Sequence, residues 1–296
     1  MSATSLRATW SATMRSLIAA VLAVLALRPL GPWALKQIGS TINATRATLV
    51  VETLQLAVAG LLGALVVSRQ SRAAVVGERL VLRGAVISLL LSPAAYVVTR
   101  WTATAIALPT LMREMNRYGT GVSRANAEPI ARVLTQPSWV ETWLAAALVA
   151  ALVEEFVFRG LVWETVASLL RGRIPNGATA LAASAVSVTL FAWLHADVPG
   201  GVGIVRFVAA IALGTTTALA RSLSGSIVPC VILHAANNSI TLLTARGALP
   251  MFGVPVFGVP LLLVAVASVL APAALYYAVF PELRRRKQAA RLLMDV

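Results

Sequence analysis

The chain has 296 residues, of which 58% are hydrophobic and only 12% charged, and its mean hydropathy is +0.83. An ordinary soluble domain carries about 25% charged residues, so this composition excludes a soluble globular protein and indicates a polytopic membrane protein. The net charge of +14 comes from Lys and Arg residues spread through the connections between apolar runs. No basic domain and no aromatic residues interleaved with basic ones are present, so the charge favours anionic lipid head groups over nucleic acid as partners.

Eight apolar runs are long enough to cross a bilayer, for which about 20 residues suffice. They lie at residues 16–35, 47–67, 84–108, 139–163, 178–197, 204–221, 227–245 and 257–280. The sequence therefore predicts an all-α fold, a membrane helix bundle of about eight transmembrane helices that forms a single membrane domain over residues 1–296. The first run has a short apolar stretch like that of a signal peptide but no small-residue cleavage site, so we expect an uncleaved signal anchor.

The basic residues also predict an orientation. With the N-terminus inside and eight spans, the cytoplasmic segments are the two tails and the connections after the second, fourth and sixth runs. These segments hold more Lys and Arg than the opposite side, whose basic residues are concentrated in one long connection from Arg100 to Ser138. Long loops weigh less in the positive-inside rule, so we expect both termini to be cytoplasmic. Within that connection, residues Ala127 to Leu134 suggest a short interfacial helix. Scarce Lys beside abundant Arg and Ala is typical of a GC-rich bacterial genome, which indicates the bacterial plasma membrane.

The fourth run carries three ionisable side chains, Glu154, Glu155 and Arg159. Charges inside a bilayer are costly and are retained for function or pairing. On a helix, Glu155 and Arg159 are four residues apart and share a face, in the order that favours an ion pair. Glu154 points about 100° away, so it is left available as a general base. The alternative is that all three form one structural network or lie beyond the membrane edge.

The only two histidines, His195 and His234, also lie in apolar runs. Phe191 precedes His195 by one helical turn, and Asn238 follows His234 by one turn, so each pair shares a helix face. Taken alone, each histidine is compatible with a buried core residue, and Asn238 is compatible with a residue that only forms hydrogen bonds between helices. The single cysteine, Cys230, reads as a small core residue.

Together, one carboxylate and two imidazoles from three helices form a set that activates water, with or without a metal. Such a set requires the three groups to lie within several ångströms of a common point. The ordered pattern of E-E-x-x-x-R, F-x-x-x-H and H-x-x-x-N resembles the CPBP intramembrane proteases. This family includes type II CAAX prenyl endopeptidases, bacteriocin-processing and self-immunity proteins, and lysostaphin-resistance-like proteins. The turn at residues 221–227 is also similar, and the resemblance covers roughly residues 139–243, within the helices at 139–245 that would form the catalytic core.

The resemblance implies an intramembrane endopeptidase in which Glu154 activates the attacking water. It implies that His195, His234 and Asn238 bind this water or stabilise the oxyanion, while Glu155 and Arg159 support the site. If a divalent metal is bound, its ligands would be Glu154, His195 and His234, a donor set that matches the ligand count of a catalytic zinc ion. These residues lack the H-E-x-x-H spacing of zinc peptidases, and a metal-free mechanism remains open.

Two other functions are compatible with these residues. A transporter for protons or metal ions also places Glu, His and Asn in membrane helices, although it more often shows inverted repeats. An inactive immunity or scaffold protein of the same family is the third possibility, against which the intact Glu154, His195 and His234 argue. As substrate we expect a membrane-bound peptide or protein, because prenylated CAAX substrates are doubtful in a bacterium.

Overall fold

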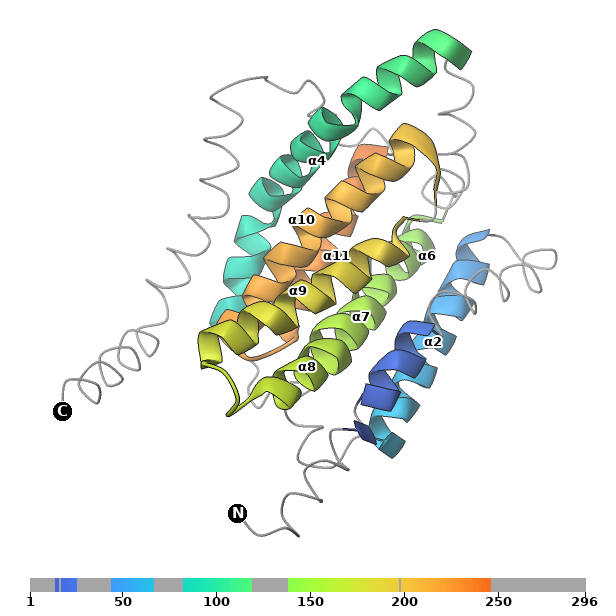
Figure 1. Cartoon of the computed structure of the whole chain (residues 1–296). Coiled ribbons are helices and arrows are strands. Elements are labelled where there is room, and N and C mark those ends of the chain that lie inside the picture. The colour runs from blue at the N-terminus through green and yellow to red at the C-terminus, as the bar shows by residue number, and fades with distance from the viewer. Residues whose placement is uncertain are drawn as a thin grey trace, which may run out of the picture.

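The computed structural model describes residues 14–15, 17–25, 44–66, 82–118, 138–196 and 198–245. Within these ranges every named element is helical, and the one isolated β-bridge joins Arg171 to Ile174. In chain order the elements are α2 (Ala44–Val66), α4 (Leu82–Tyr118), α6 (Trp139–Trp143), η1 (Leu144–Val149), α7 (Ala150–Glu155), η2 (Phe156–Val162), α8 (Trp163–Leu170), α9 (Asn176–Leu194), α10 (Gly200–Ser224) and α11 (Val228–Ala245). Figure 1 shows them as a bundle of helices inclined in the same general direction.

The helices lie where the apolar runs predicted them. α2, α4, α9, α10 and α11 each cover one predicted run, and the continuous helix from α6 to α8 covers the run at 139–163. By length and composition, α9 and α10 are the two described helices able to cross a membrane, and Val228–Leu243 of α11 is a shorter apolar helix. The run at 257–280 and the helix expected at Ala127–Leu134 lie outside the described residues, so the total of eight spans stays a prediction.

The long connection expected from Arg100 begins later than predicted. α4 continues through Arg100 and ends at Tyr118. The prediction ended the helix where hydropathy falls, but Leu111, Met112 and Glu114 all have high helix propensity, so the helix continues past the apolar segment. At this end Glu114 accepts a hydrogen bond from Gly201 N at 3.0 Å, which ties α4 to the first turn of α10.

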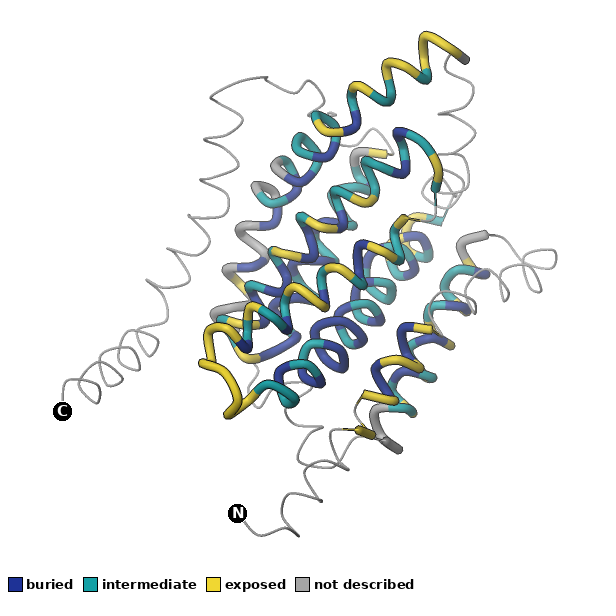
Figure 2. Tube along the Cα trace, viewed as in Figure 1, coloured by how far each residue is buried: buried dark blue, intermediate teal, exposed yellow. Residues whose placement is uncertain are grey.

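The bundle is organised around α10, which packs against α4, α9 and α11. α2 packs against η1 and α7 on the other side. Buried apolar residues of the helical residues 17–25, η2, α9, α10 and α11 form one core cluster, as the dark segments in Figure 2 show. Its largest members are Phe158, Leu161, Phe191, Leu213 and Leu233. Two helical segments more than 130 residues apart, 17–25 and η2, therefore share one core.

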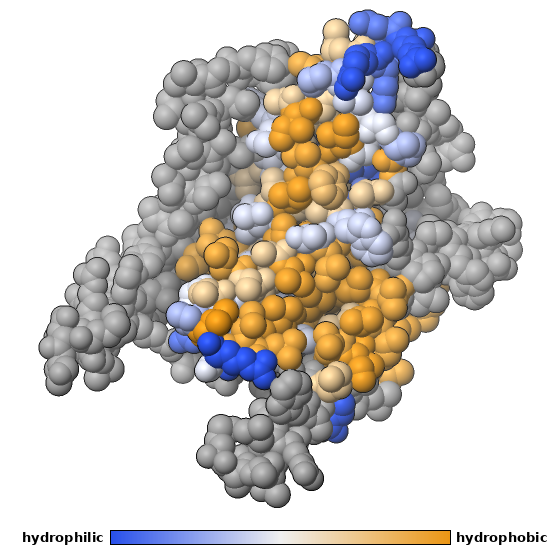
Figure 3. Space-filling view, viewed as in Figure 1, coloured by the Kyte–Doolittle hydropathy of each residue, from blue (hydrophilic) through white to orange (hydrophobic). Residues whose placement is uncertain are grey.

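The outer faces of the bundle are also apolar. Large exposed hydrophobic residues include Leu181 and Trp193 on α9, and Phe207 and Ile211 on α10. Figure 3 shows that apolar atoms cover much of the described face in this view, with hydrophilic residues gathered toward its two ends. A soluble protein rarely exposes so large an apolar surface, so this distribution agrees with helices that face lipid.

Candidate active site

The two adjacent glutamates lie on a short α-helical segment between two π-helical segments. α7 ends at Glu155, η1 precedes it and η2 follows it. π-helical turns are rare and occur frequently at functional sites. Val153, Glu155, Phe158 and Gly160 are buried, whereas the Glu154 side chain is 23% exposed. The helix thus presents one carboxylate to the interior and its neighbour to a partly open position.

Glu155 forms a buried ion pair with Arg159, as their spacing predicted. Arg159 Nε lies 3.2 Å from Glu155 Oε2, and both side chains are 0% exposed. Arg159 Nη2 donates a hydrogen bond to the carbonyl oxygen of Gly214 on α10 at 2.9 Å. The guanidinium also lies over the ring of Phe191, 4.6 Å from its centroid, where the π electrons attract it. Three helices therefore hold this buried arginine.

His234 lies between the two glutamates. Its Nδ1 is 2.8 Å from Glu155 Oε1, and its Nε2 is 3.6 Å from Glu154 Oε2. Glu155 is paired with Arg159 and so accepts hydrogen bonds, which makes Nδ1 of His234 the donor. In the neutral ring Nε2 is then an acceptor directed at Glu154. The sequence predicted proximity to Glu154 but not this contact with Glu155.

His195 reaches the same carboxylate oxygen from α9. It is the C-terminal cap of that helix, and its Nδ1 lies 2.8 Å from the carbonyl oxygen of Phe191. A carbonyl oxygen only accepts, so Nδ1 donates and Nε2 is the acceptor in the neutral ring. His195 Nε2 lies 4.0 Å from Glu154 Oε2, and the side chain is 26% exposed. The expected proximity of both histidines to Glu154 is thus present.

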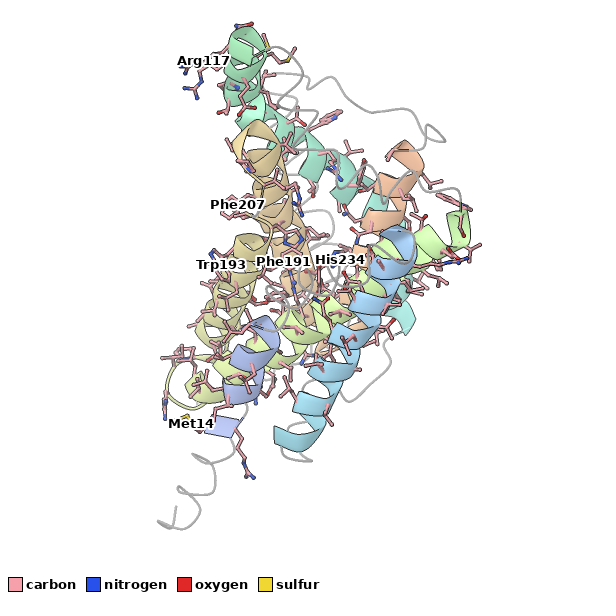
Figure 4. All side chains as sticks on the ribbon, turned by 90° about the vertical axis from the view of Figure 1, so that its right-hand side faces the viewer. Met14, Arg117, Phe191, Trp193, Phe207 and His234 are labelled. Atoms are coloured by element: carbon pink, nitrogen blue, oxygen red, sulfur yellow. The ribbon has the colours of Figure 1, made fainter. Side chains whose placement is uncertain are left out.

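Phe191 separates the imidazoles from the guanidinium. Its ring centroid lies 4.5 Å from that of His195 and 5.8 Å from that of His234. Figure 4 shows Phe191 and His234 close together near the middle of the bundle, with Trp193 and Phe207 toward its outer surface. The ring is fully buried. Phe191 therefore acts as a fixed apolar wall behind the reactive side of the site.

Three hydrogen-bond acceptors converge on one small space. They are Glu154 Oε2 and the Nε2 atoms of the two neutral imidazoles. Glu154 Oε2 is buried and has no hydrogen-bond partner among the described residues. Acceptors do not bond to one another, so the arrangement needs a proton donor or a cation between them. A water molecule can donate its two hydrogens to two of these three acceptors.

Asn238 shares a helix with His234 but is bonded elsewhere. Its Nδ2 donates to the carbonyl oxygen of Ala146 in η1 at 3.2 Å, and its Oδ1 accepts from Asn237 Nδ2 at 3.3 Å. These bonds join α11 to the helix that carries the glutamates. The described structure thus brings together Glu154, Glu155, Arg159, His195 and His234, and places Asn238 as a brace between their helices.

Two residues near the site were not found from the sequence. Gly214 supplies the carbonyl that holds Arg159, and a glycine inside an apolar helix carries no local signal of that role. Glu52 of α2 interacts electrostatically with Glu154. For Glu52 a signal existed, because it is a carboxylate within the predicted span at 47–67.

The donor types of the cluster match a catalytic zinc site, which takes three protein ligands from His and Glu. Both histidines also donate their Nδ1–H to a carboxylate or backbone carbonyl, which is the usual support of a metal-bound imidazole. As the side chains are placed, however, no group of three or more His, Cys, Asp or Glu residues in the described ranges is arranged to hold a metal ion. The chemistry of the donors fits a metal, and their spacing fits an intervening water.

Comparison with known proteins identifies the region that contains this cluster. Residues 136–240 match a family described as type II CAAX prenyl endopeptidase Rce1-like. All six predicted site residues, from Glu154 to Asn238, lie within this range. No curated protein and no solved structure matches the chain. Over residues 136–240, the part of the chain that holds the converging glutamates and histidines, the sequence is therefore similar to the Rce1-like family of type II CAAX prenyl endopeptidases.

Proposed function

We propose that the protein is an intramembrane endopeptidase that hydrolyses peptide bonds of membrane-associated substrates with a water activated by Glu154. The observation that carries this proposal is the unpartnered Oε2 of Glu154, which has His234 Nε2 at 3.6 Å and His195 Nε2 at 4.0 Å. The family match supports a protease. The side chains of Glu154 and His195 are partly exposed, so a substrate can approach the cluster from their side, although Oε2 itself is buried.

The distances favour a water shared by Glu154 and His195. A water that donates to two acceptors at about 2.8 Å each holds them roughly 4.4 Å apart, close to the 4.0 Å separation of Glu154 Oε2 and His195 Nε2. With both hydrogens engaged, its lone pairs are free to attack. His234 is only 3% exposed, so it borders this position from the buried side.

In the proposed reaction the water oxygen attacks the scissile carbonyl carbon while Glu154 takes one of its protons. The tetrahedral intermediate carries a negative oxygen, which needs a donor such as a protonated imidazole or an amide N–H. Collapse of the intermediate breaks the C–N bond, and the proton held by Glu154 passes to the leaving amine. Glu155 and Arg159 remain an ion pair throughout.

A divalent metal is a second form of the same proposal. Its ligands would be Glu154, His195 and His234, and bound zinc would lower the pKa of a coordinated water. Metal analysis of purified protein, with activity measured before and after chelation, separates the two forms. Absence of bound metal together with activity indifferent to chelators would leave the metal-free form.

The expected substrate is a membrane-bound peptide or a membrane protein with a short tail. A site among apolar helices would reach bonds near or inside the bilayer, and the exposed apolar faces of α9 and α10 support a bundle that lies in lipid. We propose an integral protein of the bacterial plasma membrane with cytoplasmic termini and with anionic lipids around its basic segments. CAAX specificity belongs to the description of the family and is part of what the assay tests.

The proposal is tested in proteoliposomes of mixed zwitterionic and anionic lipids. Two substrates are offered, a farnesylated CAAX reporter peptide and a set of membrane proteins from a bacterial host. Hydrolysis in water enriched in oxygen-18 should place the label in the new C-terminal carboxylate. Cleavage that persists in His195→Ala, or products without the label, would contradict the role assigned to the cluster.

A further inference from the structure

Gly214 lies on α10 and belongs to none of the three sequence motifs, yet it contacts Arg159 in the candidate site. Its carbonyl oxygen accepts the Nη2 hydrogen bond of Arg159 at 2.9 Å. The same oxygen lies 3.2 Å from the hydroxyl of Thr217. Both donors and the glycine are buried. The backbone carbonyl of this one residue therefore accepts a hydrogen bond from a buried guanidinium.

The missing side chain of Gly214 matters as much as its carbonyl. A Cβ atom at this position would lie 3.1 Å from Arg159 Nη2, 3.2 Å from Phe191 Cδ1 and 3.4 Å from Val188 Cγ1. The first two distances are shorter than ordinary contacts, so either the guanidinium or the aromatic ring must move. Both are fully buried, and a close-packed interior leaves little room for such a shift.

A chain of contacts connects Gly214 to the reacting groups. Arg159 is held by Gly214 and holds Glu155 by the ion pair at 3.2 Å. Glu155 in turn receives the Nδ1–H of His234 at 2.8 Å. That bond fixes which nitrogen of His234 faces Glu154. His195 is oriented separately, by the carbonyl oxygen of Phe191.

We propose that Gly214 is a positioning residue of the active site, acting through Arg159 and Glu155 to fix the ring orientation and tautomer of His234. This inference rests on the proposed function for its catalytic consequence. The positioning itself is a statement about His234 alone and is measured without any substrate. A misplacement of about 1 Å in such a site can cost about 100-fold in rate.

The chain has only two histidines, which makes the experiment direct. Protein labelled with ¹⁵N-histidine and reconstituted in lipid should give two imidazole spectra, each with a protonated Nδ1 and an unprotonated Nε2. In Gly214→Ala the His234 spectrum should change to a mixture of tautomers, whereas the His195 spectrum should keep its pattern. Single-residue substitutions of each histidine assign the two spectra.

A matched control is Gly60→Ala. Gly60 lies inside α2, and a Cβ there would meet nothing within 4 Å. This variant should leave both histidine spectra and the rate of hydrolysis unchanged. In Gly214→Ala the neighbours of the added Cβ must shift by a few tenths of an ångström, so kcat should fall by less than the 100-fold that a shift of about 1 Å can cost, on the order of 10-fold, with a smaller change in KM. An unchanged His234 spectrum in folded Gly214→Ala would overturn the proposal.

If Gly214→Ala does not fold, the double variant Arg159→Lys with Gly214→Ala tests whether the added Cβ conflicts with Arg159. A lysine removes the guanidinium atom nearest the added Cβ but keeps the positive charge beside Glu155. Recovery of folded protein in the double variant supports a conflict at Arg159, and failure to recover overturns it. If the wild-type protein instead hydrolyses no substrate while the spectra behave as expected, the proposed function fails and the positioning of His234 stands.

Discussion

Replacing Glu154 by glutamine should remove activity and leave stability unchanged, whereas replacing Glu155 by glutamine should cost stability as well. The two residues are adjacent and chemically identical, and each substitution changes only the charge and one atom. Glu154 Oε2 has no hydrogen-bond partner among the described residues and its side chain is 23% exposed. Glu155 is completely buried and contacts both Arg159 and His234. The structure therefore separates the proposed general base from its proposed support.

The magnitudes follow from these surroundings. Loss of a general base typically lowers the rate by about 10²–10⁴-fold, or about 3–5 kcal/mol of barrier, so Glu154→Gln should be nearly inactive. Its stability should be almost unchanged, because it breaks no bond in the described structure. Glu155→Gln leaves the buried charge of Arg159 without its partner, and breaking such a pair costs about 3–5 kcal/mol.

The assay combines thermal unfolding in detergent with hydrolysis in proteoliposomes. Glu154→Gln should unfold at the wild-type temperature with little or no hydrolysis, whereas Glu155→Gln should unfold at a clearly lower temperature. Thr53→Ala on the exposed face of α2 serves as a control for handling. Full activity in Glu154→Gln would refute the mechanism. Wild-type stability in Glu155→Gln would refute the conclusion that its ion pair with Arg159 stabilises the fold.

Three further predictions concern the histidines, the metal and the topology. His234→Ala should lower both activity and stability because it empties a buried position beside Glu155, whereas His195→Ala should affect chiefly activity; unfolding and rate measurements on the same samples check this. If a metal is the cofactor, chelators should reduce activity and either histidine substitution should abolish binding of the ion, as elemental analysis would detect. In a Cys230→Ala background, single cysteines in the tail at 284–291 should react with a label from the cytoplasmic side, and external labelling would contradict the predicted orientation.

The site could be located from the sequence because its signals are local. Glu155 and Arg159 are four residues apart, and an ionisable side chain in an apolar run is conspicuous wherever it falls. The contacts that refine the site are not local. His234 bonds to Glu155 across 79 residues, and the role of Gly214 depends on how α10 crosses η2, which no spacing within either helix reveals.

The fold was predictable to a similar degree and for a similar reason. Among the described residues, hydropathy located the apolar helices, but it misplaced the end of α4, because a helix does not stop where its residues become polar. The π-helical segments η1 and η2 also escaped prediction. A π-helical stretch of six or seven residues is too short to leave a period in the sequence that hydropathy detects.

The buried Arg159 also has a consequence for the insertion of the nascent chain into the membrane. In the proposed membrane arrangement its helix carries three charged residues into the bilayer, each costing about 2.5–3.5 kcal/mol when inserted alone. Glu155 is synthesised with Arg159, but Gly214 and His234 emerge from the ribosome 55 and 75 residues after Arg159. Until then the new helix lacks most of its polar partners. We therefore expect its retention in the membrane to depend on the arrival of α10 and α11, and nascent chains truncated before residue 200 to be released or degraded.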